Sequence, residues 1–459
     1  MFGTKTDGYG GRREHGGVAR RTLVASATAA LGAGLVSAGC GAVQGTRARR
    51  GTDRTRAGLV LRLPPPTGPY RDRIGVAALY LVDRSRRDPW EAGIAVREVM
   101  VSVFYPARDV GAGHPVTHPV THPVTHPVAH PVAHPVAHPV APQMSGGAAE
   151  VFRAVDVAVH RLPKKGVDWG ATRTHAHTGA PAEPVRRPVL LYTPGGGDAR
   201  TLGTGTAEEL ASHGYVVVTV DHPGDAGEVE FPVARAGRGL VRPTVFRGDP
   251  RARPRQFRTM IDARIADLRF VLDQLAALAA GRNPDAAGRA LPAGLGRALD
   301  LRRVGVYGHS AGGTAAAQVM DEDRRIRAAV NLEGFLDRPS DTPGREPEPY
   351  PVARQGADRP LLLLGSEHFP ARRELERSWS ALLAHGGGGT RRDRIDGAAH
   401  WVFSDYGALA PQLQGAGLMP AEDRNALVGA IDPAVSVPRV RHLVHGFFAR
   451  HLPVPGPGR

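Results

Sequence analysis

The stretch that decides the fold is Val304-Gly-Val-Tyr-Gly-His-Ser-Ala-Gly-Gly313, which places Ser310 in a Gly-x-Ser-x-Gly pattern. The apolar run 304–307 predicts a buried strand, and the alanine-rich residues 312–320 predict a helix. A strand can turn this sharply into a helix only if the residues two positions either side of the serine are small. We therefore interpret the stretch as a nucleophile elbow with Ser310 as the nucleophile. The alternative is a tight glycine-rich turn without chemistry.

Strand and helix patterns alternate on both sides of this stretch. Apolar or alternating runs predict strands at 97–105, 188–193, 215–220, 328–332 and 361–364. Helical patterns occur at 206–213 and 260–278, and the Gly- and Pro-rich segments at 222–256 and 281–296 are expected to be irregular. Strands that alternate with helices build parallel sheets, so we predict an α/β-hydrolase fold with a mostly parallel central sheet and helices on both faces.

A base is needed near the serine, because a serine hydroxyl alone is a poor nucleophile. The chain order in this fold is serine, acid, histidine, so the base should lie downstream of Ser310. His400 stands in the small-residue loop Asp396-Gly-Ala-Ala-His-Trp401 and is the predicted base. The histidines at 442, 445 and 451 fall on a predicted terminal amphipathic helix and are expected at the surface.

Two carboxylates compete for the role of the acid that orients His400. Glu333 follows the predicted strand 328–332, and Glu367 follows the predicted strand 361–364. Periodicity alone does not choose between them, and either could be an ordinary loop carboxylate.

An oxyanion hole requires backbone N–H groups aimed at the developing charge. One donor is expected from Ala311, the residue after the nucleophile. The other is expected from the loop Pro194-Gly-Gly-Gly197, where Pro194 itself has no N–H to donate. The triple glycine lacks the Gly-Lys-Ser/Thr sequence of a phosphate-binding loop. We predict neither a metal nor an organic cofactor.

The N-terminus has the pattern of an export signal. Arginine pairs precede a small-residue apolar run at 23–36, and Ser37-Ala-Gly-Cys40 follows. The stretch Arg20-Arg-Thr-Leu-Val24 resembles a twin-arginine signal, and Cys40, the single cysteine, ends a sequence that resembles a bacterial lipobox. We expect export, either as a cell-surface lipoprotein attached to the membrane through a lipidated Cys40 or as a secreted protein whose signal is simply cleaved.

The remaining organisation follows from composition. Residues 1–39 are assigned to the export signal, 40–60 to a flexible tether and 61–455 to the catalytic domain. A low-complexity insertion at 107–145 contains seven His-Pro-Val units from His114 to Ala141. A proline at every fourth position predicts extended polyproline-like backbone and excludes helix and sheet. Successive histidines then point in different directions, so a solvated loop is favoured over a metal site.

The chain of 459 residues carries a formal net charge of +15. Its arginines are spread along the sequence and no nucleic-acid-binding motif is present, so we expect no nucleic-acid partner. The protein is expected to act as a monomer.

The residues above resemble those of the platelet-activating-factor acetylhydrolase family (isoform II, plasma type) and related bacterial exported esterases. The likeness runs from Thr67-Gly-Pro-Tyr70 to His400-Trp-Val-Phe-Ser-Asp405 and includes 195–201, 210–215, 220–222 and the elbow. The resemblance implies that Glu333 is the acid and that Gly196 is the second oxyanion donor. It further implies hydrolysis of short-acyl phospholipids or other lipid esters. A cutinase-like polyester hydrolase and a catalytically silent surface-binding lipoprotein are the alternatives.

Overall fold

Strands and helices alternate along most of the chain, which we describe from a computed structural model covering residues 58–108, 138–385 and 389–455. The strands are Ile74–Asp83 (β1), Arg97–Pro106 (β2), Val140–Pro142 (β3), Arg173–Thr178 (β4), Arg187–Thr193 (β5), Val216–Val220 (β6), Glu228–Glu230 (β7), Val241–Pro243 (β8), Leu299–His309 (β9), Ile326–Leu332 (β10), Asp337–Arg338 (β11), Glu348–Pro349 (β12), Leu361–Ser366 (β13) and Thr390–Ile395 (β14). The α-helices are Gly146–Val159 (α1), Thr204–Ser212 (α2), Pro254–Ala279 (α3), Ala311–Glu322 (α4), Pro351–Gln355 (α5), Arg372–Leu383 (α6), Tyr406–Gly415 (α7), Ala421–Val428 (α8) and Pro433–His451 (α9). The short 3-10 helices are Trp169–Ala171 (η1), Arg200–Gly203 (η2), Pro250–Ala252 (η3), Gly296–Ala298 (η4) and His400–Phe403 (η5).

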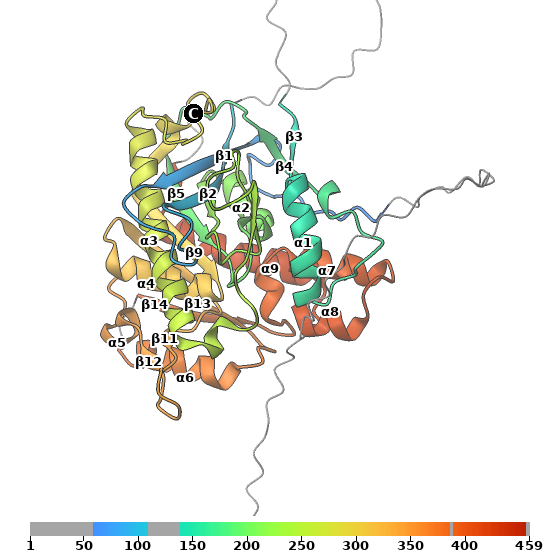
Figure 1. Cartoon of the computed structure of the whole chain (residues 1–459), viewed down its shortest axis with the longest axis vertical. Helices are drawn as coiled ribbons and strands as arrows, with labels where there is room; N and C mark the ends of the chain where they lie inside the picture. The colour runs from blue at the N-terminus through green and yellow to red at the C-terminus, as the bar shows by residue number, and fades with distance from the viewer. Residues whose placement is uncertain (1–57, 109–137, 386–388, 456–459) are drawn as a thin grey trace, which may run out of the picture. The chain divides into compact units, whose positions relative to one another are not determined.

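One sheet of ten strands runs through the fold in the order β14-β13-β10-β9-β5-β6-β2-β1-β4-β3 (Figure 1). The strands from β14 to β6 are all parallel, and β2 then joins β6 and β1 in antiparallel pairing. The predicted α/β fold with a mostly parallel central sheet is therefore confirmed. In a parallel sheet the carboxyl ends of neighbouring strands share one edge, which is where this fold type assembles its sites.

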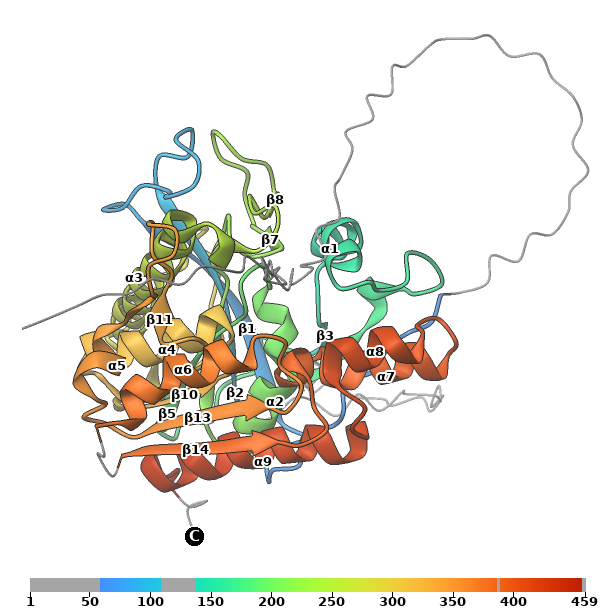
Figure 2. The same ribbon diagram turned by 90° about the horizontal axis from the view of Figure 1, so that it is seen from below.

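Helices cover both faces of the sheet. Along β6, Val216, Val218 and Val220 pack into the core cluster that includes α3, α4 and α6, and Val217 packs into the cluster that includes α2 and α9. Figure 2 shows α9 on one side of β13 and β14 and α6 on the other. This alternation is why the central strands are continuous apolar runs, since both of their faces are buried.

Segment 222–256, which was expected to be irregular, contains more structure than its composition suggested. Strands β7 and β8 pair within it, and α3 begins at Pro254, six residues before the predicted start. Proline suits the first turn of a helix because that turn does not need its N–H. The high glycine and proline content therefore predicted the turns of this segment correctly but did not reveal the two short strands.

The expectation that the whole His-Pro-Val repeat excludes sheet structure is wrong for its last residues. Val140–Pro142 form β3, an edge strand that pairs with β4, and His138 Nδ1 lies 3.2 Å from the Thr178 carbonyl oxygen. An edge strand tolerates proline, because one side of its backbone has no partner strand. The rest of the repeat, together with the predicted export signal and Cys40, lies outside the described residues.

Among the helices of the described residues, none combines the length and the apolar character that a membrane-spanning segment requires.

Candidate active site

Ser310 occupies a strained turn between β9 and α4. Its φ and ψ angles are 54° and −121°, a region that side-chain-bearing residues rarely adopt. A Cβ on Gly308 would lie 2.3 Å from the Gly312 carbonyl oxygen, and one on Gly312 would lie 2.0 Å from the Thr193 carbonyl oxygen. The glycines of the elbow are therefore required by close backbone packing, and the turn leaves Ser310 partly exposed at the carboxyl edge of the sheet.

Glu333 and His400 come from two further connections at the same edge. Glu333 directly follows β10, and its backbone N–H donates to the Leu364 carbonyl oxygen of β13 at 2.9 Å. Its φ is 62°, so this residue is also held in the left-handed region. His400 begins η5, in the loop after β14. Although these residues lie far apart in sequence, the strand order brings them together.

The two side chains meet directly. His400 Nδ1 lies 2.7 Å from Glu333 Oε2, with Glu333 fully buried and the His400 side chain 13% exposed. The hydroxyl and backbone N–H of Ser366, at the end of β13, donate to the other carboxylate oxygen of Glu333. This arrangement fixes both the carboxylate and the imidazole, and it leaves His400 Nε2 as the nitrogen available for proton transfer.

Glu367, the competing acid, is placed differently. Its carboxylate accepts the Gly397 backbone N–H at 2.7 Å and lies 3.8 Å from His368 Nε2. It therefore braces the loop that leads to His400, while Glu333 contacts the imidazole.

The elbow is bonded to the backbone beside Glu333 and to the backbone of His400. The Ser310 N–H donates to the Leu332 carbonyl oxygen at 2.8 Å, directly before Glu333. His309 Nε2 lies 3.0 Å from the His400 carbonyl oxygen, and the two imidazole rings are 4.4 Å apart between centroids. Within the described part of the chain, the Ser310 hydroxyl has no hydrogen-bond partner. The contact between nucleophile and base is often long or poorly aligned before substrate binds and tightens in the complex with substrate.

The two predicted oxyanion donors lie side by side. A Cβ on Gly196 would be 3.6 Å from Ala311 Cβ. Ala311 is the first residue of α4, and an N–H in the first turn has no acceptor inside the helix. No described residue accepts a hydrogen bond from the Gly196 N–H. Within the described residues, neither N–H has a hydrogen-bond acceptor, as the prediction of an oxyanion hole at Gly196 and Ala311 requires.

Arg264 on α3 holds residues 194–198, called the glycine loop below, and was not among the predicted site residues. Its guanidinium donates to the carbonyl oxygens of Pro194 and Gly195 and, through Nε, to Asp225 Oδ2 at 2.6 Å. Asp225 Oδ1 in turn accepts the Gly197 N–H at 3.0 Å. A signal did exist, since the helical spacing that predicts α3 puts position 264 on the buried face.

Aromatic side chains form a wall beside His400. Phe369 lies 4.7 Å from the His400 ring and 5.8 Å from Phe335, between ring centroids. The Arg251 guanidinium stacks on Phe335 at 3.7 Å. Both phenylalanines are only partly buried, so the wall presents apolar surface next to the candidate base.

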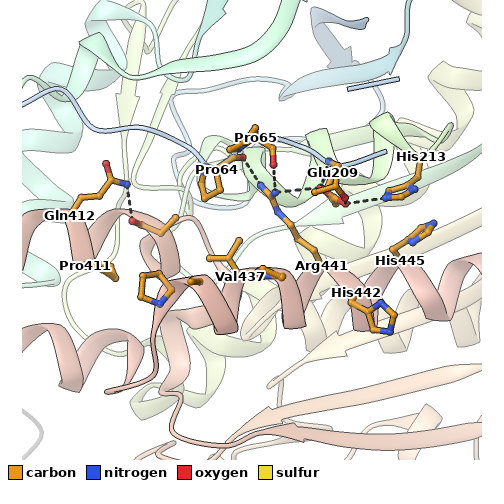
Figure 3. A pocket seen from close by; sticks show the side chains of 15 residues that line it. Pro64, Pro65, Glu209, His213, Pro411, Gln412, Val437, Arg441, His442 and His445 are labelled. Atoms are coloured by element: carbon orange, nitrogen blue, oxygen red, sulfur yellow. Dashed lines mark hydrogen bonds and ion pairs between the residues drawn. The ribbon is translucent and has the colours of Figure 1, made fainter. Parts of the chain in front are cut away.

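A separate groove of about 720 Å³ lies among α2, α7 and α9. Figure 3 shows Arg441 in this groove, bonded to the carbonyl oxygens of Pro64 and Pro65 and to Glu209. His445, which was expected at the surface, is half-buried here and stacks on His213 at 3.8 Å between centroids. The groove is lined by none of the predicted site residues, so we assign no catalytic role to it.

Residues 139–453 match the model of a known protein family, described as "Platelet-activating factor acetylhydrolase, isoform II". A "Probable 1-alkyl-2-acetylglycerophosphocholine esterase" of Arthroderma benhamiae is 29% identical over 57% of this chain and 59% of its own. The platelet-activating factor acetylhydrolase of Cavia porcellus is 22% identical over 62% of each chain. This chain therefore spans about three fifths of the length of these curated relatives.

A solved structure also matches. The ferulic acid esterase from Streptomyces cinnamoneus superimposes with a TM-score of 0.60 and 31% sequence identity, over 86% of this chain and 94% of that one.

Proposed function

Because the chain belongs to the platelet-activating factor acetylhydrolase isoform II family, we propose that it is a serine carboxylic-ester hydrolase that works through an acyl-enzyme. The observation that carries the proposal is the 2.7 Å contact between His400 Nδ1 and Glu333 Oε2, next to a serine held in a strained elbow. A base that is oriented by a buried carboxylate is what a serine nucleophile needs.

The proposed reaction has two halves. Ser310 Oγ attacks the ester carbonyl while His400 Nε2 takes the hydroxyl proton, and Glu333 stabilises the resulting imidazolium. The Gly196 and Ala311 N–H groups bind the negatively charged oxygen of the tetrahedral intermediate. His400 then returns the proton to the leaving alcohol. A water molecule attacks the acyl-enzyme by the same route and releases the acid and the free serine.

Short-acyl phospholipids or other lipid esters are the substrate class we favour. Two relatives are named for esters of this type, a 1-alkyl-2-acetylglycerophosphocholine and platelet-activating factor. A second candidate class is the hydroxycinnamoyl esters. It is supported by the likeness to a ferulic acid esterase and by the Phe335–Phe369 wall, which offers aromatic surface to a ring-bearing acyl group.

The enzymatic role is tested with a fluorophosphonate probe and p-nitrophenyl acetate. The wild-type chain should be labelled and should turn over the ester, and Ser310→Ala should do neither while keeping its circular dichroism spectrum. Ser380→Ala, which changes an exposed serine on α6, is the matched control and should behave as wild type. Labelling that persists in Ser310→Ala contradicts the nucleophile assignment, and no labelling of the wild type favours a silent binding protein.

The substrate class is tested by comparing kcat/KM across three kinds of ester. The panel consists of 2-acetyl and 2-hexanoyl glycerophosphocholines, methyl ferulate, and a polyester film. The favoured class predicts the highest kcat/KM for the acetyl phospholipid. Higher values for methyl ferulate or release of monomers from the film would move the assignment to hydroxycinnamoyl esters or to polyesters.

We also propose that the enzyme is exported and attached to a membrane through Cys40. The support is sequence alone: the arginine-led apolar run and the small residues that end at Cys40. Expression in a bacterial host with radiolabelled palmitate should label the wild type and leave Cys40→Ala unlabelled. Unlabelled wild type found free in the medium would instead indicate simple signal cleavage.

A further inference from the structure

Behind the candidate active site lies a buried group of acidic and histidine side chains that the proposed reaction does not use. Asp156 and His160 come from α1 and its C-terminal cap, and Asp198 comes from the glycine loop that carries Gly196. One ligand atom from each of the three lies within 4.8 Å of the other two. The carboxyl group of Glu228, on β7, lies close enough to that of Asp156 for the two to share a hydrogen bond when one is protonated. All four residues are at least nine-tenths buried.

The carboxylates of this group lack the partners that buried charges normally have. Both oxygens of Asp198, both of Glu228 and Oδ2 of Asp156 have no hydrogen-bond partner within the described residues. No described arginine or lysine forms an ion pair with any of the three. Elsewhere in the same fold, buried acids are neutralised by arginine, as Asp267 is by Arg97. Three carboxylates in one buried place carry a large desolvation cost unless they bind protons or a cation.

The histidine of the group is suited to binding a cation. Burial lowers the pKa of His160 to about 4, so its imidazole is neutral at physiological pH and has a free lone pair. Burial and the charge of Asp198 raise the pKa of Asp156, and burial and the charge of Asp156 raise that of Glu228. A cation bound here would displace the protons that these two carboxyl groups hold, so cation binding should release protons.

We propose that Asp156, His160 and Asp198 bind one divalent transition-metal cation, with Glu228 as a further carboxylate close by. The ligand set of one imidazole and carboxylate oxygens is one that Zn²⁺ and Mn²⁺ accept. No such site was predicted from the sequence.

The distances are those of a site that needs only a small contraction. His160 Nε2 lies 3.9 Å from Asp156 Oδ1 and 3.9 Å from Asp198 Oδ1, too far for hydrogen bonds. Neighbouring ligand atoms around a tetrahedral Zn²⁺ lie about 3.4 Å apart, given metal–ligand distances of about 2.1 Å. The three ligand atoms, which all lie within 4.8 Å of one another, must therefore move closer together to share one ion.

The position of the cluster connects it to the reaction. Asp198 Oδ2 lies 3.8 Å from Nδ1 of His309, the residue directly before Ser310, and that nitrogen also lacks a hydrogen-bond partner among the described residues. The His160 ring lies 4.3 Å from Trp401, the residue after His400, between centroids. A cation here would fix the glycine loop at Asp198, in addition to the bonds that Arg264 makes to Pro194 and Gly195. Asp156, His160 and Asp198 are thus positioning residues, and they do not contact the reacting atoms.

Zinc binding by the full-length chain is the direct test, because it does not depend on ester hydrolysis. The wild type, His160→Gln and Asp198→Asn are stripped with EDTA and titrated with Zn²⁺ against a chromophoric chelator, with bound zinc measured by mass spectrometry. We expect the wild type to hold one zinc more tightly, by at least tenfold, than either variant. We also expect zinc to raise the Tm of the wild type and to leave the Tm of both variants unchanged.

His175→Gln is the matched control, because His175 is also bonded to a carboxylate, that of Glu208, but lies outside the cluster. The repeat histidines contribute equally to all these chains, so any weak zinc binding by the repeat cancels in the comparison. His175→Gln should keep the tight zinc. A parallel titration with Mn²⁺ that showed the same dependence on His160 would equally support a cation site. Equal zinc affinity and equal Tm shifts in the wild type, His160→Gln and Asp198→Asn would overturn the proposal. If Asp198→Asn fails to fold, His160→Gln alone decides.

Discussion

Glu333 Oε2 lies 2.7 Å from Nδ1 of His400, a residue 67 positions further along the chain. The contact exists because β10 lies between β9 and β13, which places the turn after β10 beside both the elbow and the loop before η5. Glu333 adopts a φ of 62° to reach inward, and Ser366 holds its second oxygen. Local strain at Glu333 is therefore compensated by hydrogen bonds from a neighbouring strand.

The choice of acid is tested by comparing Glu333→Gln with Glu367→Gln. The amide of Glu333→Gln cannot stabilise the imidazolium and disturbs the His400 tautomer, so we expect kcat for p-nitrophenyl acetate to fall by roughly 10³- to 10⁴-fold with little change in KM. Glu367→Gln removes a charge but keeps a side-chain oxygen that can accept the Gly397 N–H, so it should lower kcat by less than about tenfold. A larger loss from Glu367→Gln would reverse the assignment.

Ser366 is predicted to position the acid. Its hydroxyl lies 2.7 Å and 3.0 Å from the two Glu333 oxygens. Removing one hydrogen bond to a charged group costs about 1.5 kcal/mol, so Ser366→Ala should lower kcat by roughly tenfold. Ser366→Thr keeps a hydroxyl and should recover part of the rate. Equal rates for Ser366→Ala and the wild type would show that the backbone N–H of residue 366 is sufficient.

Arg264 is predicted to stabilise both the fold and the glycine loop. Arg264→Met leaves Asp225 as a buried, unpaired carboxylate and frees the Pro194 and Gly195 carbonyl oxygens, so urea unfolding should show a loss of about 3–5 kcal/mol. The activity of the folded fraction should also fall, since the loop carries Gly196.

The double variant Arg264→Met/Asp225→Asn separates these two effects. It should recover part of the stability, because no buried charge remains, but not the activity. Recovery of full activity would contradict a role for Arg264 in holding the loop.

Stability is predicted to decrease as the pH falls from 6.5 towards 4, in part because of His222. Burial lowers the pKa of His222 to about 4. The hydrogen bond to Asp267 acts in the opposite direction, and the positive charge of Arg264 lowers the pKa further. Below about pH 6.5, His222 binds a proton in the unfolded chain but stays neutral in the folded chain. The free energy of unfolding is therefore highest above pH 6.5 and decreases as the pH falls towards 4.

Between pH 6.5 and pH 5, protonation of His222 in the unfolded chain should lower the free energy of unfolding by about 2 kcal/mol, from 1.36 kcal/mol per pH unit over about 1.5 units. Urea unfolding at pH 7.5, 6 and 5 should show the decline, and His222→Gln should show a shallower one. Identical pH slopes for the two proteins would contradict a neutral buried His222.

The sequence and the structure agree most closely where the determining contacts are local. The strand before Ser310, the helix after it and the glycines between them are fixed by neighbouring residues, and the predicted ranges differ from β9 and α4 by only a few positions. The buried parallel strands were also predictable, because burial of both faces demands apolar residues throughout. Short pairs such as β7 and β8 were not, since a three-residue strand is too short for its alternation to be read.

The sequence by itself determined the elbow, its strained serine and the parallel sheet that carries it, because steric fit in a turn and apolar burial act between residues close in the chain. Only the tertiary structure decided that His400 contacts Glu333 while Glu367 braces the loop beside it. The contacts of Arg264 with Asp225 and the glycine loop, and the buried cluster of His160 with three acids, were likewise decided only by the tertiary structure. These contacts join residues from separate connections, so their pairing depends on strand order and on which side chains share a dry interior, where unpaired charge is costly.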